Sequence, residues 1–357
     1  MALALVPGIG PKRLATLLTH FESADGALSA PFAFLCRLPG ISRACATAIK
    51  TARPEAASQA LERVAELGGQ CLLPGDPEFP AILLEIPDPP ALLFAVGKVE
   101  LLTLPAVAIV GSRDHTPYGG EVCRLIADRA ARAGLAVVSG MARGLDAVAH
   151  HAALDASGAT IGVLGNGLGV VYPAGNRLLY ERVAADGLML TEFPPGERPH
   201  HGSFPRRNRL ISGLCRVTLV VEAVKGSGTM LTVEAALAQG RDVMAVPGPI
   251  TSPTSEGTNR LIRDGAEPLL ETTDLLRHYG LETAGRVLIN QDPPCANLDL
   301  FSPDEVSVLA ALGQGPQIAD QLALALERTV AAVLDLLCGL ELAGVVEGLP
   351  GGRYRRI

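Results

Sequence analysis

The stretch Ala106-Val107-Ala108-Ile109-Val110-Gly111-Ser112-Arg113 decides the fold of this chain of 357 residues. Five apolar residues in a row lead straight into a glycine turn, which is the pattern of a buried parallel strand that ends in a strand-to-helix loop. Similar apolar runs, each followed by a turn and a helical segment, lie at residues 106–110, 135–139, 160–164, 188–192, 217–222 and 242–246. Six such alternations predict an α/β fold with a doubly wound parallel sheet.

The region before the sheet contains an internal repeat. Residues 6–13 (VPGIGPKR) recur as residues 38–43 (LPGISR), and each copy leads into a helix-like stretch. The pattern predicts a small all-helical domain and resembles the helix-hairpin-helix element, in which glycine turns let backbone N–H groups approach a phosphate. Because Ser42 replaces the second glycine, contact with nucleic acid and a ligand-free pair of helix connections both stay open.

Proline-rich stretches suggest where the domains meet. Residues 74–97 include Pro87-Asp88-Pro89-Pro90, through which no continuous helix passes, so they are expected to form an extended connector. Asp292-Pro293-Pro294 marks a linker, and the chain then shows helical periodicity that ends in a hairpin-like tail. We expect a helical domain at 1–68, the sheet domain at 69–280, a linker at 281–300 and a winged-helix-like domain at 301–357.

Composition limits the class of protein. Apolar residues make up 48% and charged residues 19%, with a formal net charge of −7, so a folded protein is expected and any basic site must be local. The 7 cysteines are scattered and lack a CxxC pair, which predicts reduced thiols, no disulfide and no metal. No apolar run approaches ~18 residues and residues 1–10 lack a secretory pattern, so a cytoplasmic protein without a membrane span is expected.

Glycine turns follow the carboxyl ends of the predicted strands, where ligands bind in open parallel sheets. They are Gly111-Ser112-Arg113, Gly140-Met141-Ala142-Arg143-Gly144, Gly165-Asn166-Gly167 and Lys225-Gly226-Ser227-Gly228-Thr229. Such turns expose N–H groups beside helix N-termini, and Arg113, Arg143 and Lys225 add positive charge. A single turn of this kind would indicate only a tight connection, but the set favours a phosphate-binding edge.

The fourth predicted strand is followed by the most basic stretch of the sheet domain. Residues 198–216 hold five arginines and no acidic residue, and they include Phe204-Pro205-Arg206-Arg207-Asn208-Arg209. Clustering without counter-charges favours contact with an anionic ligand, so Arg207→Glu is expected to weaken binding more than Arg207→Ala. Phe204 and Tyr172 are candidate stacking surfaces, although core packing is the stronger expectation for Phe204.

Several common sites are not supported by the residues. Leu92 replaces the first glycine that a P-loop ending at Gly97-Lys98 would need, and Val170 replaces the last glycine of a GxGxxG motif. These departures disfavour ATP hydrolysis and NAD binding. His150-His151 and His200-His201 lack metal-ligand spacing, and Ser139 lacks the GxSxG motif of a serine hydrolase.

Longer motifs resemble the successive signatures of a known family, DNA-processing protein A (DprA, also called Smf). They are AIVGSR at 108–113, SGMARGLD at 139–146, FPRRNRLISG at 204–213 and GSGT at 226–229, and with DPPALLF at 88–94 the resemblance covers about residues 75–276. It implies an extended Rossmann-like sheet that binds single-stranded DNA, a homodimer, and loading of the RecA recombinase during natural transformation. Because phosphate binding needs arginines and backbone amides but no catalytic base, we expect no enzyme activity and no cofactor.

The motifs place the DNA pocket at named positions. Carried over by resemblance, it comprises Gly111, Ser112, Arg113, Gly140, Arg143, Lys225, Gly226, Ser227 and Gly228; the residue patterns add Phe204, Arg206, Arg207, Asn208, Arg209 and Thr229.

The GSGT turn also suggests an alternative function, that of an enzyme. The turn also resembles the PGGxGT loop of Rossmann-like phosphoribohydrolases, which cleave nucleoside monophosphates. Those enzymes place a glutamate two or three residues after the threonine, where this chain has Leu231 and Thr232, and Glu234 comes too late. The third possibility, a scaffold that binds only proteins, is disfavoured by the phosphate-binding turns.

Overall fold

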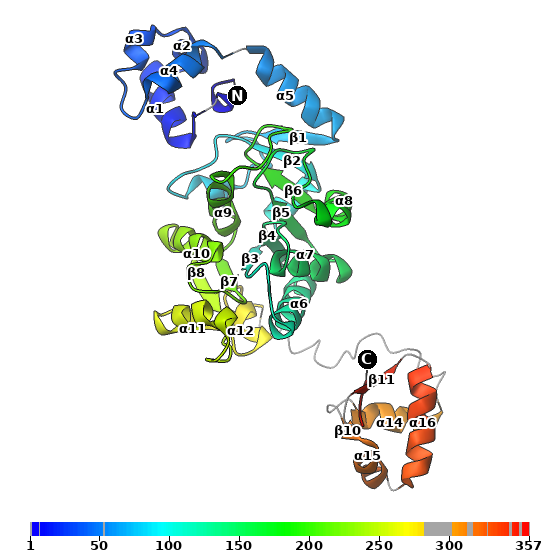
Figure 1. The fold of residues 1–357 in the computed structure, drawn as a ribbon. Helices are drawn as coiled ribbons and strands as arrows, with labels where there is room; N and C mark the ends of the chain where they lie inside the picture. The colour runs from blue at the N-terminus through cyan, green and yellow to red at the C-terminus, as the bar shows by residue number, and fades with distance from the viewer. Residues whose placement is uncertain are drawn as a thin grey trace. The chain divides into compact units, whose positions relative to one another are not determined.

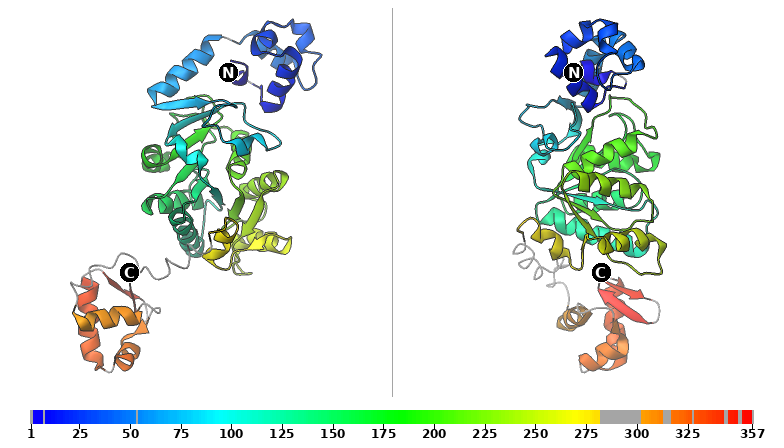
Figure 2. Two further views of the ribbon diagram at one scale, coloured as in Figure 1. Left: turned by 180° about the vertical axis from the view of Figure 1, so that it is seen from behind. Right: turned by 90° about the vertical axis from the view of Figure 1, so that its left-hand side faces the viewer.

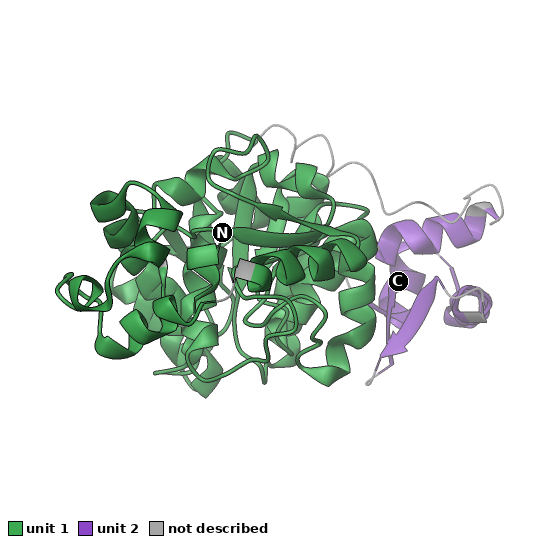
Figure 3. Cartoon of the chain, turned by 90° about the horizontal axis from the view of Figure 1, so that it is seen from above, with its two compact units in different colours: residues 1–285 green, residues 286–357 purple. Residues whose placement is uncertain are grey.

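The computed structural model describes residues 2–6, 8–52, 54–281, 302–312, 317–326, 328–342, 345–349 and 352–356. The chain forms two compact units, residues 1–285 and 286–357 (Figure 3). The expected boundary at residue 68 stays a prediction. Nearly all of the expected linker at 281–300 lies outside the described residues.

All six predicted strands are present, each within two residues of the expected bounds. They are β3 (Ala106–Val110), β4 (Ala136–Ser139), β5 (Thr160–Val163), β6 (Leu188–Thr191), β7 (Val217–Val220) and β8 (Asp242–Ala245). In the order β6-β5-β4-β3-β7-β8 every neighbouring pair is parallel, which confirms the doubly wound sheet.

The expected connector extends the sheet. β2 (Leu93–Gly97) pairs antiparallel with β6, and β1 (Gly69–Leu72) pairs antiparallel with β2. Along the chain, the short 3-10 helix η2 (Ala81–Leu84) lies between β1 and β2. At the other edge of the sheet, β9 (Glu267–Pro268) pairs with β8. Residues 74–97 are therefore partly a strand, because the prolines interrupt only the part before Leu93.

Helices cover both faces of the sheet (Figures 1 and 2). Side chains alternate along β3: Val107 and Ile109 pack with one set of helices, and Ala108 and Val110 pack with the other. The first set contains α6 (Pro117–Arg132), α7 (Leu145–Asp155) and α12 (Thr272–Arg277), with α8 (Arg177–Asp186) beside α7. The second contains α9 (Ser203–Gly213), α10 (Gly228–Ala238) and α11 (Glu256–Arg263).

The first part of the chain is helical, as predicted. It contains the 3-10 helix η1 (Ala2–Leu5) and the helices α1 (Pro11–Phe21), α2 (Ala24–Ser29), α3 (Phe32–Leu35), α4 (Arg43–Lys50) and α5 (Pro54–Glu66). Arg13 joins the two repeat turns, because its guanidinium donates to Gly8 O at 2.6 Å and to Gly40 O at 2.9 Å. The repeat therefore forms a pair of turns held together by an arginine of the first copy.

The second unit has the winged-helix arrangement expected from the sequence. Its elements are α14 (Pro303–Leu312), β10 (Gln317–Ile318), α15 (Ala319–Ala325), α16 (Val330–Leu342), β11 (Val346–Leu349) and β12 (Arg353–Arg356). The strands form a sheet in the order β10-β12-β11. Val308, Leu322, Val333 and Leu337 are fully buried between the helices and form the core of this unit.

Two further findings concern the cysteines and the helices of the described residues. Their six cysteines are free thiols. None of their helices combines the length and the apolar character that crossing a membrane requires.

Candidate functional site

The strand order creates a switch point between β3 and β7. These neighbouring strands lead to helices on opposite faces of the sheet, which leaves a crevice beyond their carboxyl ends. A cavity of about 640 Å³ lies there. Nine of the predicted site residues line it: Gly111, Ser112, Arg113, Phe204, Arg207, Asn208, Ser227, Gly228 and Thr229.

A second, smaller cavity of about 70 Å³ shares part of this wall. Both cavities are lined by Arg113, Ala142, Tyr172, Phe204 and Arg207, and the smaller one adds further residues of the loops after β4 and β5. It thereby includes the predicted residues Gly140 and Arg143, together with Gly165 and Asn166. The turns after β3, β4 and β5 and the start of α10 therefore converge on one region.

The turn after β4 is held by polar side chains from two helical segments. Asp146 Oδ2 in α7 accepts from Gly140 N at 3.2 Å and from Ala142 N at 3.4 Å. Asn176, in the 3-10 helix η4 (Ala174–Asn176), donates to Met141 O at 3.0 Å and to Ala142 O at 3.1 Å. Met141 adopts a positive φ of 57° with a fully buried side chain, so these bonds stabilise a backbone shape that a non-glycine residue rarely adopts.

The turns after β3 and β4 also pack backbone against backbone. Gly144 has φ +81°, and a Cβ at this position would lie 2.5 Å from both Ser112 O and Arg113 O. A side chain here would push the two turns apart. Gly144 therefore sets the spacing of Arg113 and Arg143, which both extend into solvent from these turns.

Arg207 is buried beneath the cavity. Only 5% of the residue is exposed, and its Nη1 donates to Val163 O at 2.5 Å and to Gly140 O. It thus joins the carboxyl ends of β4 and β5. Burial lowers the pKa of Arg207, and the charge of Asp146 acts in the opposite direction; burial likewise raises the pKa of Asp146 and the charge of Arg207 opposes this.

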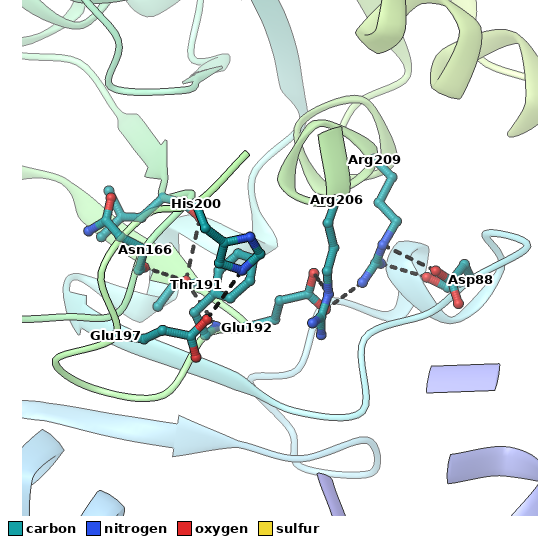
Figure 4. Close-up of polar contacts among 10 residues, drawn as sticks. Asp88, Asn166, Thr191, Glu192, Glu197, His200, Arg206 and Arg209 are labelled. Atoms are coloured by element: carbon teal, nitrogen blue, oxygen red, sulfur yellow. Dashed lines mark hydrogen bonds and ion pairs between the residues drawn. The ribbon is translucent and has the colours of Figure 1, made fainter. Parts of the chain in front are cut away.

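The expectation that the arginines of α9 lack counter-charges is wrong for Arg206 and Arg209. Glu192, which follows β6 and is 6% exposed, lies 2.9 Å from Arg206 Nε and 2.5 Å from Arg209 Nη2 (Figure 4). Arg209 also contacts Asp88 of the connector, at 3.4 Å. The carboxylates come from other parts of the chain, which is why a window on residues 198–216 missed them. Neither arginine lines either cavity.

Two aromatic rings stand at the cavity wall. Phe204 is half-buried, and its ring centroid lies 5.6 Å from that of Tyr172. The guanidinium carbon of Arg113 lies 5.9 Å from the centroid of Phe204, within the range of cation–π attraction. Phe204 therefore faces the cavity instead of packing wholly in the core, and Tyr172 belongs to the site although its position in a loop gave only a weak signal.

The start of α10 lines the same cavity. Ser227 precedes the helix with an extended backbone, and its buried Oγ has no hydrogen-bond partner among the described residues. Thr229 Oγ1 donates to Gly111 O at 3.2 Å, which ties this turn to the turn after β3. Lys225 and Gly226 line neither cavity; Lys225 Nζ lies 3.9 Å from Glu256.

The paired histidines have separate surroundings. His150 is fully buried, and its Nδ1 lies 2.7 Å from Thr160 Oγ1. Because Thr160 donates its own hydrogen to Val137 O, the hydroxyl oxygen accepts from His150, which assigns the proton to Nδ1. His200 and His201 are exposed and line the larger cavity. His200 lies 3.7 Å from Glu197, and within the described ranges no cluster of three metal-ligating side chains occurs.

Fold and site together define an extended Rossmann-like α/β protein that has a cavity at the carboxyl edge of its sheet and a winged-helix domain. Residues 70–280 match the family described as DNA recombination-mediator protein A, and residues 291–352 match the DprA winged helix domain. The chain therefore belongs to the DNA-processing protein A (DprA/Smf) family.

Individual relatives agree with this membership. The chain is 34% identical to protein Smf of Synechocystis sp. over 388 aligned residues, which cover 100% of this chain and 98% of the relative. It is 40% identical to protein Smf of Escherichia coli over 80% of this chain and 77% of the relative.

Two solved structures resemble the chain as well. DNA processing protein A of Streptococcus pneumoniae matches with a TM-score of 0.68 and 34% identity, over 77% of this chain and 95% of that one. DNA processing protein A of Helicobacter pylori, whose structure is described as showing a unique single-stranded DNA binding mode, matches with a TM-score of 0.55 and 30% identity, over 61% of this chain and 96% of that one.

Proposed function

We propose that this protein binds single-stranded DNA without sequence preference in the cavity at the β3–β7 switch point. The observation that carries the proposal is the convergence of Arg113, the Tyr172–Phe204 ring pair and the start of α10 on one cavity. A cation and free helix N–H groups suit phosphate, and an aromatic pair suits a base. The relative from Helicobacter pylori supports this ligand.

The proposed DNA contacts differ in kind among the predicted residues. Arg113 and Arg143 are exposed and contact phosphates, whereas Ser227, Gly228 and Thr229 offer the N-terminal end of α10. Arg207 shapes the floor from its buried position. Arg206 and Arg209 hold α9 to Glu192 after β6, and Arg209 also holds it to Asp88 of the connector. Lys225 and Gly226 shape the turn before α10.

A compact site fits the composition. The cavity volume of about 640 Å³ lies within the range of small-ligand sites, ~300–1,000 Å³. The chain has no tryptophan and only 4% aromatic residues, which are too few to line a long groove on which bases stack. The site therefore holds a few nucleotides and takes most of its affinity from phosphates.

We propose that the protein is not an enzyme. Leu231 and Thr232, at the positions where a phosphoribohydrolase needs its glutamate, line the cavity, and Glu234 does not. Asp146 also lines it, but this carboxylate is buried and engaged by the turn after β4. Release of free base from nucleoside monophosphates, abolished by Asp146→Asn, would instead establish the phosphoribohydrolase alternative.

The family also suggests partners. We propose that the protein acts in the cytoplasm as a homodimer that loads the RecA recombinase on DNA taken up in natural transformation. Leu237, Ile250 and Leu270 are 62%, 95% and 74% exposed, and they lie close in the chain to β8 or to the edge strand β9, which supports a protein contact there. Leu237→Arg should halve the mass measured by light scattering; an unchanged mass would remove this surface from the dimer.

The test of DNA binding is a comparison of equal-length single and double strands over a salt series. Tighter binding of the single strand, with log K falling linearly against log salt, is expected. Equal binding of both forms would contradict the proposed ligand, and a salt-independent affinity would contradict the phosphate contacts.

A further inference from the structure

The winged-helix unit has an unusual net charge for a DNA-binding domain. Residues 301–357 contain four arginines and no lysine against seven acidic residues, a formal charge of −3. Within the described residues, Arg328 is paired with Asp304 and Arg355 lies 2.8 Å from Glu347. DNA binding by this kind of domain depends on basic residues that neutralise phosphates, and two of the four arginines are already paired with carboxylates.

The lack of positive charge is clearest on the helix that would enter a DNA groove. In helix-turn-helix proteins the second helix of the motif lies in the major groove, and α16 holds that place after α15. Its thirteen residues include Asp335 and Glu341 but no lysine, arginine or histidine. Asp335 is exposed, so α16 would bring a negative charge toward the phosphates.

The exposed face of α16 instead combines apolar residues with the acidic Asp335 and Glu341. Val330, Leu334 and Cys338 follow one another at intervals of four residues, so they share a face of the helix, and all three are exposed. Val333, Leu337 and Leu340, on the adjoining face of the helix, are buried in the core. We call Val330, Leu334 and Cys338 the α16 stripe; Leu324 at the end of α15, 83% exposed, adds to the apolar surface of the same unit.

We propose that the α16 stripe is a docking site for a basic amphipathic helix of a partner protein. The stripe spans roughly 12 Å, which matches the reach of anchors at i, i+4 and i+7 on a partner helix. Asp335 beside the stripe selects lysine or arginine on the partner, and the same charge disfavours both a second copy of α16 and DNA. This function is separate from DNA binding by the sheet domain.

The test uses the full chain and a fluorescent helical peptide of about 18 residues with a leucine face flanked by lysines. Two control peptides are a scrambled sequence and a version with glutamate for lysine. The basic amphipathic peptide is expected to bind at least tenfold tighter than either control. Equal affinity for the three peptides would overturn the proposal.

The alkylation rate of Cys338 shows where the peptide binds, without any mutation. Saturating peptide should slow alkylation of Cys338 severalfold and leave Cys36, a partly exposed thiol of the helical N-terminal part, unaffected. An unchanged rate at Cys338 would show that the peptide binds elsewhere. Protection of Cys338 by duplex DNA instead of the peptide would make α16 a DNA-binding helix and refute the proposal.

Matched variants distinguish docking on the α16 stripe from non-specific hydrophobic binding. Leu334→Glu should weaken the peptide at least tenfold, whereas Leu178→Glu, at a 73% exposed leucine of α8, should leave its affinity unchanged. Asp335→Lys, at an exposed position, should reverse the preference between the lysine and glutamate peptides even if Leu334→Glu fails to fold. Equal losses in Leu334→Glu and Leu178→Glu, or an unreversed preference, would count against the α16 stripe.

Discussion

Arg207 of α9 donates a hydrogen bond to the carbonyl oxygen of Gly140, directly after β4. A Cβ on Gly140 would lie 2.5 Å from the Nη1 of this arginine, so the glycine leaves the space that the guanidinium occupies. The same nitrogen contacts Val163 O, and so one buried cation joins two strand ends beneath the cavity. The most basic segment of the sheet domain thus contributes a structural element as well as surface charge.

Substitutions at Arg207 should therefore act first on stability. Arg207→Ala and Arg207→Glu should each lower the free energy of unfolding by about 3 kcal/mol or more, because they leave buried carbonyls without a donor and Asp146 without its neighbouring cation. Urea unfolding measures the loss. Arg132→Ala, at an exposed ion pair, is the control and should change stability by less than ~1 kcal/mol. Wild-type stability in both Arg207 variants would show that this residue does not join the strands.

Arg113→Ala should weaken single-strand binding without unfolding the protein. The side chain is exposed at the cavity and makes no ion pair in the described part of the chain, so the fold does not depend on it. If one phosphate contact is lost, the slope of log K against log salt should fall by ~0.7. Fluorescence anisotropy over a salt series measures this slope, and an unaltered slope in a folded variant would place Arg113 outside the DNA contacts.

Removal of the winged-helix unit should leave most of the single-strand affinity in place. A chain that ends at residue 300 keeps every residue of both cavities, and residues 1–285 form a compact unit of their own. Anisotropy should therefore give an affinity within a few-fold of the full chain. A folded truncation that no longer binds would mean that the site lies in the other unit.

His150 should make stability depend on pH. Burial lowers the pKa of this histidine from 6.5 to about 3, so between these values the unfolded chain binds a proton that the folded chain does not. The contribution of His150 to stability is complete above about pH 6.5 and decreases as the pH falls, by about 2 kcal/mol between pH 7 and pH 5.

His150→Asn provides the comparison for this effect. An asparagine amide can still donate to Thr160 Oγ1 but does not titrate, so the variant should show a flatter profile of unfolding free energy over this pH range. Parallel profiles for the variant and the wild type would assign the pH dependence to other groups.

The sheet was predictable because its signals are local. The apolar runs and glycine turns of residues 106–246 can be read within windows of about ten residues, and buried parallel strands leave this pattern whatever their neighbours are. Since parallel strands place their carboxyl ends at one edge, the positions of Gly111, Arg113 and Ser227 in the chain were enough to predict that they meet. The connector was the exception, because β2 joins the sheet by pairing with the distant β6.

Tertiary structure alone decided which charges are available to a ligand. Arg209 meets Glu192 from another element and Asp88 from 121 positions earlier, and no local window shows such partners. Burial decided the role of Arg207, and packing placed Phe204 beside Tyr172. The sequence by itself determined which segments become strands and turns, because backbone conformation and apolar periodicity are properties of neighbouring residues. The fold decided which polar side chains are satisfied internally, because burial and pairing depend on residues brought together from far apart in the chain.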